Sequence, residues 1–516
     1  MLKQQSNTTK PIVIVRDVSV VTSGGVTLVP SIFLSIHSEK IGLVGANGVG
    51  KSTLLRIIAG VVFPSSGSVD RFGTVAYLPQ SGFGDEISVQ TLIQNRVNPK
   101  DEGLMRSFLG RFGLGSINMS RAVSTFSGGE QMKIFLSVLL SRGPDLLILD
   151  EPTNNLDRSG RGFLYSFVQG YKKGILVVSH DRELLQNVDH IIELQPTGIT
   201  EYGGNYDFYV EQKAVQQQAL DRSISSARQE LTRNVHTQRS ILEKRQQMKN
   251  KSRARSYDTG MSKQMRGHRQ RKAEESTGKL KDVHGDRVES SKTRVEELLL
   301  SVQKKNVIKL DLEHTHVPRG KMMIEMVDVD FTYSSDTKNI ISDMNLSVYG
   351  PEKIAVEGNN GSGKTTLVRL ITGEITPTSG LISVGANRVS YLDQHTQIID
   401  PNLSLVQNFE KLHKGFSRSR IREYLGRFLF TESDVFKKGS ELSGGERIKA
   451  ALALILGGVN QPHVLMLDEP TNNLDIDSIE QLESALQNYK GCLLVISHDA
   501  AFLESIGIER RIQLSS

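Results

Sequence analysis

The sequence predicts an α/β protein in which one domain occurs twice, with an α-helical hairpin between the two copies. A set of short motifs returns in the same order, with Lys51 repeated as Lys364 and His180 repeated as His498. Each copy alternates short apolar strands with helical stretches. The segment between the copies carries apolar residues at helical steps and a strong positive charge. Repetition of this kind fixes the architecture before any single residue is considered.

The composition is that of a globular protein of about three domains. Of the 516 residues, 38% are apolar and 23% are charged, and each copy is large enough for its own core. No apolar run is long enough for a membrane span, and the first ten residues lack the apolar core of a signal peptide. Cys492 is the single cysteine, which excludes an internal disulfide and a cysteine-based zinc site. A cytoplasmic location is expected.

The strands of each copy are predicted from runs that are apolar throughout. Such runs occupy residues 40–44, 146–149 and 175–178 and are typical of strands buried on both faces of a parallel sheet. Helical stretches at 52–59 and 365–372 follow the first strand of each copy after a glycine-rich loop. The predicted domains are residues 1–205, 206–320 and 321–516.

Two apolar stripes at steps of three and four predict two antiparallel helices in the central segment. The stripes consist of Leu220, Ile224, Ala227, Leu231 and Val235, and of Val288, Val295, Leu298, Leu299 and Val302. The first helix, from residue 208 to about 257, would reach roughly 70 Å. The tip of the hairpin, at about residues 249–272, has almost no apolar periodicity.

Positive charge is concentrated near this tip. Residues 244–272 hold eleven Lys or Arg and one acid, a net +10, whereas the whole chain carries +6 and the remainder therefore −4. A bare charge run is most often a solvated coil. Placed at the end of a long hairpin, it is better suited to phosphate contact.

Two glycine-rich loops predict two phosphate-binding sites. GANGVGKST at 45–53 and GNNGSGKTT at 358–366 let successive backbone N–H groups converge on phosphates at a helix N-terminus. Lys51 and Lys364 would reach the β- and γ-phosphates, and Ser52 and Thr365 would ligate Mg²⁺. The predicted loop residues are Gly45, Asn47, Gly48, Gly50, Lys51, Ser52 and Thr53, and Gly358, Asn360, Gly361, Gly363, Lys364, Thr365 and Thr366.

The octapeptide DEPTNNLD occurs twice, at 150–157 and 468–475, and predicts the hydrolytic carboxylates. Asp150 and Asp468 end apolar strands, where each would bind Mg²⁺. The next residues, Glu151 and Glu469, are placed to polarise an attacking water. A structural ion pair is the alternative, which duplication of an identical octapeptide disfavours. The histidines of the two Ser-His-Asp triplets, His180 and His498, are interpreted as γ-phosphate sensors rather than core residues.

In this order the motifs resemble those of the ATP-binding-cassette ATPases. The remaining members of the set are FSGGEQ at 126–131, LSGGER at 442–447, and two glutamines, Gln80 and Gln394. The resemblance implies ATP and Mg²⁺ as cofactors, with both glutamines near the metal. It also implies that a monomer closes its two cassettes head to tail, so that the signature of each cassette completes the other's site. The implied signature residues are Ser127, Gly128 and Gly129, and Ser443, Gly444 and Gly445.

The base-binding position differs between the copies. The family places an aromatic residue under adenine, and Tyr333 matches it in the second copy. The corresponding region of the first copy reads VSVV at 18–21 and holds no aromatic residue. Adenine stacking is therefore expected at one site only.

Twin cassettes with a basic hairpin between them are similar to the ABC-F family, whose junction is matched by YGGNYDFY at 202–209. This resemblance implies binding to the ribosomal tRNA exit site in the ATP-bound state, without a membrane partner. The linker would then extend toward the peptidyl-transferase centre and contact rRNA and peptidyl-tRNA. The expected RNA contacts are Lys249, Lys251, Arg253, Arg255, Lys263, Arg266, Arg269, Arg271 and Lys272.

Within that family the sequence favours the antibiotic-resistance group, which protects the ribosome. Gln80 and Ser127 are 47 positions apart and Gln394 and Ser443 are 49 apart, so the first cassette carries no extra arm. A housekeeping factor that relieves stalled ribosomes is the close alternative. The ATPase subunit of a transporter is a distant one, since a basic hairpin has no role in membrane coupling. Intact Glu151 and Glu469 disfavour an inactive RNA-binding scaffold.

Overall fold

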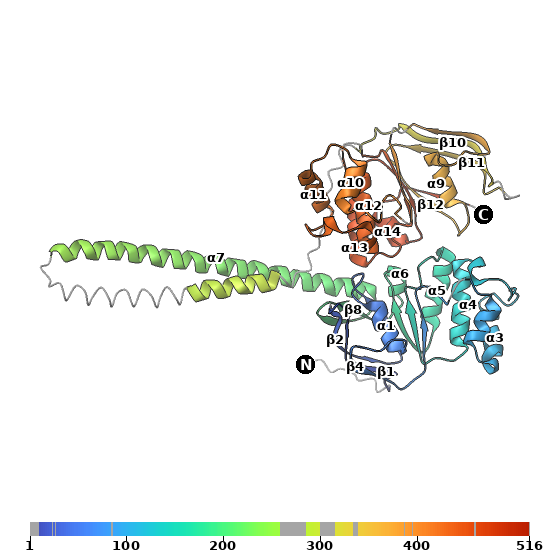
Figure 1. The fold of residues 1–516 in the computed structure, drawn as a ribbon, viewed down its shortest axis with the longest axis horizontal. Helices are drawn as coiled ribbons and strands as arrows, with labels where there is room; N and C mark the ends of the chain where they lie inside the picture. Colours follow the sequence, from blue (N-terminus) through green and yellow to red (C-terminus); the bar gives the residue numbers. More distant parts are fainter. Residues whose placement is uncertain are drawn as a thin grey trace. The chain divides into compact units, whose positions relative to one another are not determined.

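The computed structural model divides the chain into two units, one of Met1–Phe208 with Asn306–Ser516 and one of Tyr209–Lys305 (Figure 1). The residues that it describes are 10–22, 24–25, 27–83, 86–258, 285–299, 315–333, 339–385, 388–394, 396–458 and 461–514. Within these ranges, no helix is both long and apolar enough to cross a membrane.

The first cassette is built on a six-stranded sheet with the order β5-β6-β7-β3-β8-β9, parallel except for the β8–β9 hairpin. Its strands are β3 (Lys40–Val44), β5 (Val75–Leu78), β6 (Leu146–Asp150), β7 (Gly174–Val178), β8 (His190–Gln195) and β9 (Gly198–Gly203). A second, antiparallel sheet has the order β2-β1-β4, with β1 (Val13–Val21), β2 (Thr27–Ile36) and β4 (Ser66–Arg71).

Helix α1 (Lys51–Ala59) lies between these two sheets (Figure 1). Its buried residues Leu54 and Ile58 belong to one apolar cluster with Val13 and Val29 of the small sheet and Ile148 of the large one. The other helices of this cassette are α2 (Val89–Arg96), α3 (Glu102–Arg111), α4 (Gly128–Leu140), α5 (Arg158–Gly170) and α6 (Arg182–Leu185), with 3-10 turns at Pro99–Asp101 and Val123–Thr125. The position of α1 directs its N-terminus to the carboxyl ends of the parallel strands, where ligands bind in α/β sheets.

The second cassette repeats this arrangement. Its parallel sheet has the order β14-β15-β16-β12-β17 and its antiparallel sheet the order β11-β10-β13. The strands are β10 (Met322–Phe331), β11 (Ile341–Tyr349), β12 (Lys353–Glu357), β13 (Ser379–Val384), β14 (Val389–Leu392), β15 (Val464–Asp468), β16 (Cys492–Ile496) and β17 (Arg510–Gln513). The helices are α9 (Lys364–Thr372), α10 (Leu405–Leu412), α11 (Arg418–Arg427), α12 (Gly444–Leu456), α13 (Ile476–Gln487) and α14 (Ala500–Ser505), with 3-10 turns at Asp434–Phe436 and Gly439–Glu441.

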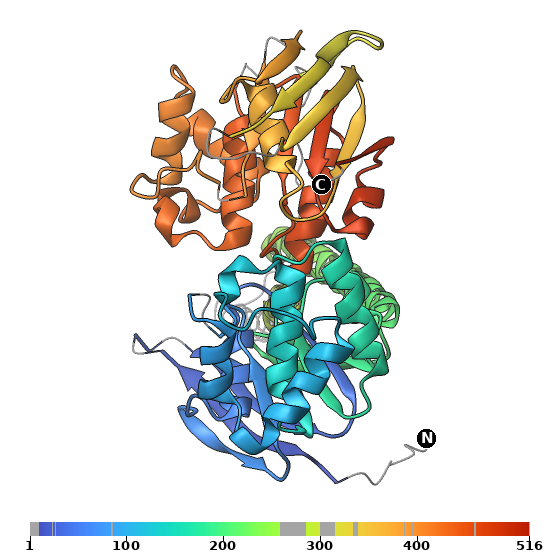
Figure 2. The same ribbon diagram turned by 90° about the vertical axis from the view of Figure 1, so that its right-hand side faces the viewer.

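Two apolar clusters cover the two faces of this second sheet. One joins β10, β11 and α9 to the sheet, and the other joins α10 to α14 to its opposite face. Figure 2 shows these layers, with the orange helices on one side of the red strands and the yellow β10–β11 pair on the other. The strands and P-loop helices predicted from the sequence are confirmed, and the lone thiol, Cys492, is buried in β16.

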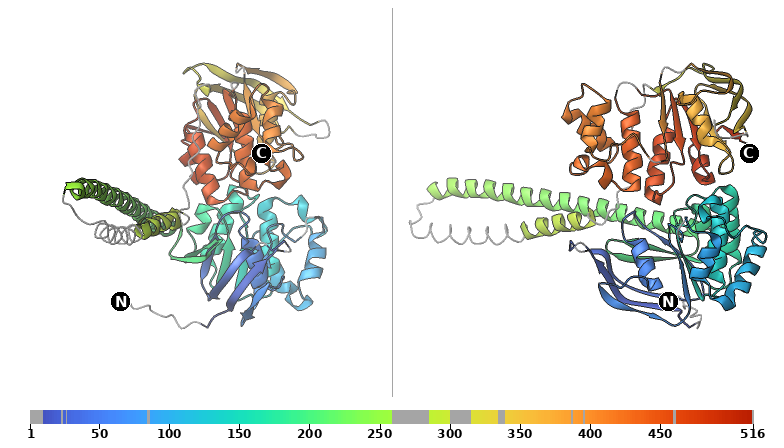
Figure 3. Two further views of the ribbon diagram at one scale, coloured as in Figure 1. Left: turned by 60° about the vertical axis from the view of Figure 1, so that its left-hand side comes forward. Right: turned by 45° about the vertical axis from the view of Figure 1, so that its right-hand side comes forward.

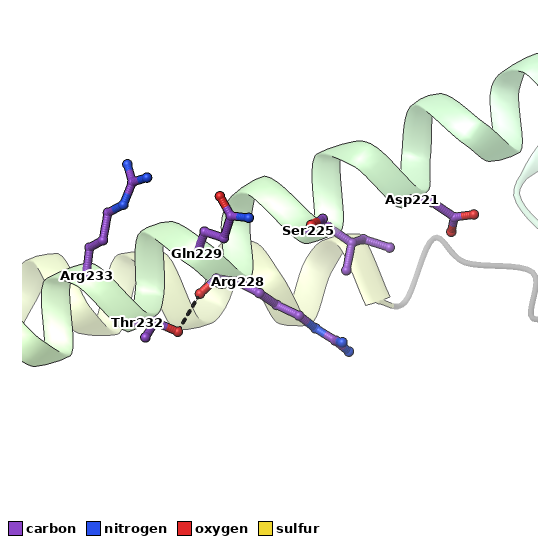
Figure 4. A pocket seen from close by; sticks show the side chains of 7 residues that line it. Asp221, Ser225, Arg228, Gln229, Thr232 and Arg233 are labelled. Carbon is purple, nitrogen blue, oxygen red and sulfur yellow. Dashed lines mark hydrogen bonds between the residues drawn. The ribbon is translucent and has the colours of Figure 1, made fainter.

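The second unit contains two helices that pack antiparallel, as the apolar stripes predict. Helix α7 (Tyr206–Asp258) enters this unit and runs beside the helix at residues 285–299 (Figure 3). The Asn234 amide donates a hydrogen bond of 2.9 Å to the Ser291 hydroxyl, and Arg294 lies 3.7 Å from Glu230. Figure 4 shows a pocket along α7, which is lined by polar side chains such as Gln229 and Arg233 together with the buried Ile224.

The stripe predictions hold for most positions. Ile224, Ala227 and Val295 are buried, whereas Leu299 is 39% exposed, so its assignment to the seam is wrong. Leu299 lies next to Leu298 on the helix, and two adjacent residues cannot both face one partner.

Val302 lies outside the described residues, as do Lys263, Arg266, Arg269, Arg271 and Lys272 of the expected tip. The earlier tip residues Lys249, Lys251, Arg253 and Arg255 lie on the last turns of α7.

The hairpin seam is tested by a charge placed at Ala227. Because Ala227 is 4% exposed, Ala227→Asp would bury an unpaired carboxylate between two helices, whereas Ser226→Asp adds the same charge on an exposed position. We expect hydrogen exchange of amides in residues 220–235 and 288–298 to accelerate at least about tenfold in the first variant and to stay unchanged in the second. Equal protection in both variants would contradict the seam.

Candidate nucleotide sites

Each glycine-rich loop connects the end of a central strand to the start of a helix. Gly50 precedes α1 with φ 104°, and Gly363 precedes α9 with φ 90°. A Cβ atom at Gly50 would come within 2.6 Å of Val29, and one at Gly363 within 2.9 Å of Ile340. Only glycine combines this left-handed conformation with so close an approach. The backbone N–H groups at both helix starts therefore face the loop, where an anion is favoured.

The P-loop lysine is held by its own loop in both copies. Lys51 donates to the carbonyl oxygens of Gly45 (2.7 Å) and Ala46 (3.1 Å), and Lys364 donates to Gly358 (2.7 Å) and Asn359 (3.0 Å). Burial lowers the pKa of both ammonium groups. A partly desolvated cation next to the N–H groups of a helix start is a site whose chemistry fits a polyphosphate.

The hydroxyl and carboxylate predicted to bind Mg²⁺ meet in each copy. The Ser52 hydroxyl donates to Asp150 Oδ1 at 3.0 Å, and the Thr365 hydroxyl donates to Asp468 Oδ2 at 3.1 Å. Hard oxygen donors of this kind suit Mg²⁺. A tyrosine that sequence reasoning did not assign completes each set, with Tyr77 3.0 Å from Asp150 and Tyr391 3.1 Å from Asp468. The sequence does carry a signal for this residue, because a tyrosine stands three positions before both Gln80 and Gln394.

The carboxylate of each predicted catalytic glutamate lies beside a histidine. Glu151 Oε1 is 3.3 Å from His180 Nε2, and Glu469 Oε1 is 3.5 Å from His498 Nε2. Burial raises the pKa of both glutamates to about 7 and lowers that of His180 to about 3 and of His498 to about 4. The histidines are therefore neutral, and these contacts are not ion pairs. His180 Nε2 and His498 Nε2 are buried without a hydrogen-bond partner, as fits a group that meets a ligand.

Both glutamates also adopt a strained backbone. Glu151 has φ 48° and Glu469 has φ 46°, a left-handed conformation that non-glycine residues rarely adopt. The same strain recurs at Asn155 (φ 65°) and Asn473 (φ 61°). Strain of this kind costs about 1–3 kcal/mol per residue and persists where the surrounding structure imposes it.

These asparagines and their neighbour Asp475 connect the two cassettes within their common unit. The Asn47 backbone N–H donates to Asp475 Oδ2 at 2.9 Å, and the Asn47 amide donates to the Asn473 carbonyl at 2.8 Å. In the other copy the Asn360 amide donates to the Asn155 carbonyl at 3.2 Å. Sequence reasoning missed all three contact residues, although the octapeptide that holds them is identical in both copies.

A cavity of about 470 Å³ lies at the second P-loop. Predicted ligands from several motifs line it, namely Asn360, Gly361, Gly363, Lys364, Thr365, Thr366, Gln394, Asp468, Glu469 and His498. The first cassette contributes Asn155 and Leu156. The signature residues Ser127, Gly128 and Gly129 do not line the cavity; Ser127 caps α4 instead, and Ser443 caps α12 in the same way.

The two sites are not equivalent in their surroundings. Arg182 pairs with Glu483 at 2.9 Å across the cassettes, and Arg158 lies 3.4 Å from Glu357 beside the second P-loop. The repeat places Ala500 and Tyr165 at the positions of the first pair, and Ile476 and Val44 at those of the second. Neither ion pair therefore has a counterpart at the equivalent positions of the repeat.

The aromatic residue predicted to lie under adenine also occurs in one copy only. The Tyr333 hydroxyl lies 3.4 Å from that of Thr366 in the second P-loop helix, and the Tyr333 ring packs edge-on against Phe331 at 4.8 Å. Strand β1, which occupies the place of β10, has no aromatic residue at Val18–Val21.

Comparisons with known proteins agree with this geometry. The family model described as ABC transporter matches residues 33–154 and 341–472. The energy-dependent translational throttle protein EttA of Mycobacterium tuberculosis is 32% identical, over 93% of this chain and 88% of its own length. ABC transporter F family member 5 of Arabidopsis thaliana is 30% identical, over 93% of this chain and 72% of its own.

A solved structure with the same fold is the archaeal ribosome recycling factor aABCE1 in complex with the stalk protein aP1. Its TM-score is 0.60 at 18% identity, with 96% of this chain and 87% of that chain covered. The tandem-cassette fold predicted from the sequence is confirmed.

The raised glutamate pKa values predict a pH-dependent stability. Ionised Glu151 and Glu469 are unfavourable when buried, so stability is full below their ordinary pKa of 4.5 and is lost as the pH rises through about 7. The double variant Glu151→Gln/Glu469→Gln removes this loss. We expect it to match the wild type in thermal unfolding at pH 4.5 and to be more stable at pH 8, on the order of 1–3 kcal/mol per glutamate. A difference that is equal at both pH values would refute the buried ionisation.

Proposed function

The chain belongs to the ABC-F family of ATP-binding-cassette proteins, and from that premise we propose that it is an ATPase that binds the ribosome when ATP closes its cassettes. The observation that carries the proposal is the convergence, in both copies, of a P-loop lysine, a hydroxyl–aspartate pair and a buried glutamate–histidine pair. A scaffold with inactive cassettes would have no need to keep both sets intact.

The chemistry assigned to each site is ATP hydrolysis with Mg²⁺. Mg²⁺ would neutralise charge on the β- and γ-phosphates, held by Ser52 and Asp150 in one site and by Thr365 and Asp468 in the other, with Gln80 and Gln394 nearby. Glu151 and Glu469 would polarise water, and a pKa of about 7 suits a general base at neutral pH. His180 and His498, neutral and buried, would donate a hydrogen bond to the γ-phosphate.

Closure would bring the signature of each cassette onto the other's nucleotide. The asparagine contacts between Asn47 and Asn473 and between Asn360 and Asn155 support this, because they already join each P-loop to the opposite cassette. Backbone N–H groups at the starts of α4 and α12, beginning at Gly128 and Gly444, would then complete the anion sites. Hydrolysis would remove the γ-phosphate that holds the interface and permit release.

The ribosome is proposed as the partner from family membership and from charge. The throttle relative is named for translation, and the linker concentrates a net +10 in residues 244–272. Arginine and lysine at that density suit RNA phosphates, at the tRNA exit site and toward peptidyl-tRNA. We propose ribosomal protection against an antibiotic as the biological outcome. In the described residues, the segment between Gln80 and Ser127 holds two α-helices and two 3-10 turns, as does the segment between Gln394 and Ser443, so the first cassette shows no extra arm relative to the second.

A second outcome, relief of stalled ribosomes or throttling of translation, is favoured by the relatives. The throttle protein covers 93% of this chain. Antibiotic susceptibility of cells with and without the protein separates the two outcomes: protection predicts a shift in susceptibility to peptidyl-transferase drugs, and the translation factor predicts none.

The ATP-dependent partner is tested with Glu151→Gln/Glu469→Gln. Loss of the general base should slow ATP turnover by about 10²-fold or more and trap the closed form on 70S ribosomes in a sucrose gradient with ATP but not with ADP. Glu201→Gln/Glu504→Gln, which changes the same charge at exposed positions, should behave as the wild type. Wild-type turnover in the first variant would remove both glutamates from catalysis, and absence from ribosomes with every nucleotide would discard the ribosome.

The linker is tested by Arg253→Gln, Arg255→Gln, Arg266→Gln and Arg269→Gln together. Losing four cations should abolish the cellular effect, and ribosome binding measured at increasing salt concentrations should be weaker than that of the wild type. ATP turnover should stay within about twofold of the wild-type rate. Four exposed cassette arginines, Arg106, Arg111, Arg418 and Arg427, changed to Gln provide the matched control. Full cellular activity in the linker variant would show that the tip is not the effector.

A further inference from the structure

The first cassette contains a second pocket, of about 790 Å³, that the proposed ATPase does not use. It is bounded by α1, β5, α2 and the end of α4, and it shares only Tyr77, Gln80 and Asp150 with the nucleotide site. Three arginines from three different helical regions line it, Arg56, Arg96 and Arg142. We call it the arginine pocket.

Two of the three arginines, Arg96 and Arg142, contact neutral partners. Arg142 donates a hydrogen bond to the Arg96 carbonyl oxygen, and the Arg96 guanidinium lies 4.8 Å from the centre of the Phe83 ring. The Arg56 cation acts electrostatically on the Tyr77 hydroxyl and on the Asp150 carboxylate. Among the described residues, no carboxylate forms an ion pair with any of them; Asp150, which lines the same pocket, is engaged by Ser52 and Tyr77. The pocket therefore holds three guanidinium groups and one carboxylate, which leaves an excess of positive charge.

The walls between these arginines are apolar. Val138 and Leu139 of α4 are buried beneath the pocket, with Val75 and Phe83 beside them. A ligand with an anionic backbone and flat apolar faces fits both features. Guanidinium forks match phosphate oxygens, and bases stack on aromatic side chains and on arginine planes.

The internal repeat shows that the fold does not require this pocket. Arg96 is the last residue of α2, and the last residue of α10 is Leu412. Arg142 stands two positions beyond α4, and Gly458 stands two beyond α12. In the second cassette the His413 ring occupies the space near Gly458, within 2.8 Å of where a Cβ would lie. Two of the three arginines are thus particular to one copy, although both copies keep the nucleotide motifs.

From this we propose that the arginine pocket binds a single-stranded RNA segment, with phosphates on Arg56, Arg96 and Arg142 and a base against the apolar wall. A purely acidic protein segment would satisfy the charge but leave the apolar wall formed by Val75, Val138 and Leu139 without a flat partner. RNA supplies both chemistries in one chain. The arginine pocket belongs to the first cassette rather than to the linker, and it adjoins the first nucleotide site through Tyr77, Gln80 and Asp150.

The chain contains no tryptophan, so one introduced tryptophan reports on one place. Phe83→Trp sets an indole under Arg96, and Trp favours such a contact. Phe436→Trp is the matched control, because Arg422 lies 5.1 Å from the Phe436 ring in the second cassette. We titrate each full-length protein with a ten-nucleotide single-stranded RNA without ATP. The proposal expects saturable quenching or a spectral shift in the first protein and none in the second.

Arg96→Leu/Arg142→Gly, built on Phe83→Trp, introduces the residues that the second cassette has at these positions. We expect RNA affinity reported by the indole to fall at least about tenfold and the slope of log K against log salt to fall by about 1.4, for two lost phosphate contacts. If Arg96→Leu/Arg142→Gly lowers the melting temperature of the protein, Arg96→Gln/Arg142→Gln replaces it in the same measurement. No RNA signal at the indole, an unchanged slope, or a response to a glutamate-rich peptide in place of RNA would each overturn the proposal.

Discussion

The structure depends on holding two adjacent carboxylates at the end of a strand that is buried on both faces. Asp150 ends β6 and Asp468 ends β15, where every residue of both strands is buried. Ionised carboxylates are costly there unless hydroxyls, N–H groups or a metal compensate them. The Ser52 and Tyr77 hydroxyls do so for Asp150, and the next residue, Glu151, has a left-handed backbone and a carboxylate 3.3 Å from His180. The layers around each sheet serve to keep this edge dry and fixed.

The repeat places the same pair of adjacent carboxylates in both cassettes, and the two copies differ in the residues around that pair. The pairs Arg182–Glu483 and Arg158–Glu357 occur once, as does the tyrosine predicted to lie under a base, Tyr333. Arg161, buried beside Asp181 at 3.0 Å, is replaced by Ile479 in the repeat, and its charge acts on Glu469 and not on Glu151. The chemistry is thus common to both sites, whereas the electrostatic environment of the two glutamates is not.

The parts of the fold that the sequence could predict are those set by local pattern. Strands such as β6 and the helices that follow Gly50 and Gly363 were predictable, because buried strands and P-loops constrain residue type at each position. Asn155 and Asn473 were not, since their role is a contact with residues more than 200 positions away in the chain. Leu299 shows that local pattern also has a limit, because periodicity alone cannot decide which of two adjacent leucines faces the partner helix. Which Ser-Gly-Gly residues meet nucleotide depends on closure and stays a prediction.

The arginine pocket and the first nucleotide site share Tyr77, Gln80 and Asp150, and this sharing has a thermodynamic consequence. Tyr77 donates to Asp150, and Arg56 acts electrostatically on both groups, so a phosphate that draws Arg56 away alters the surroundings of the carboxylate assigned to Mg²⁺. If RNA in the pocket changes ATP affinity by some factor, ATP must change RNA affinity by the same factor. The second cassette keeps Arg369, Tyr391 and Asp468 at the equivalent positions, but Leu412 and Gly458 replace the other two arginines of the pocket. A partner on the first cassette would therefore act on one ATP site directly and on the other only through closure.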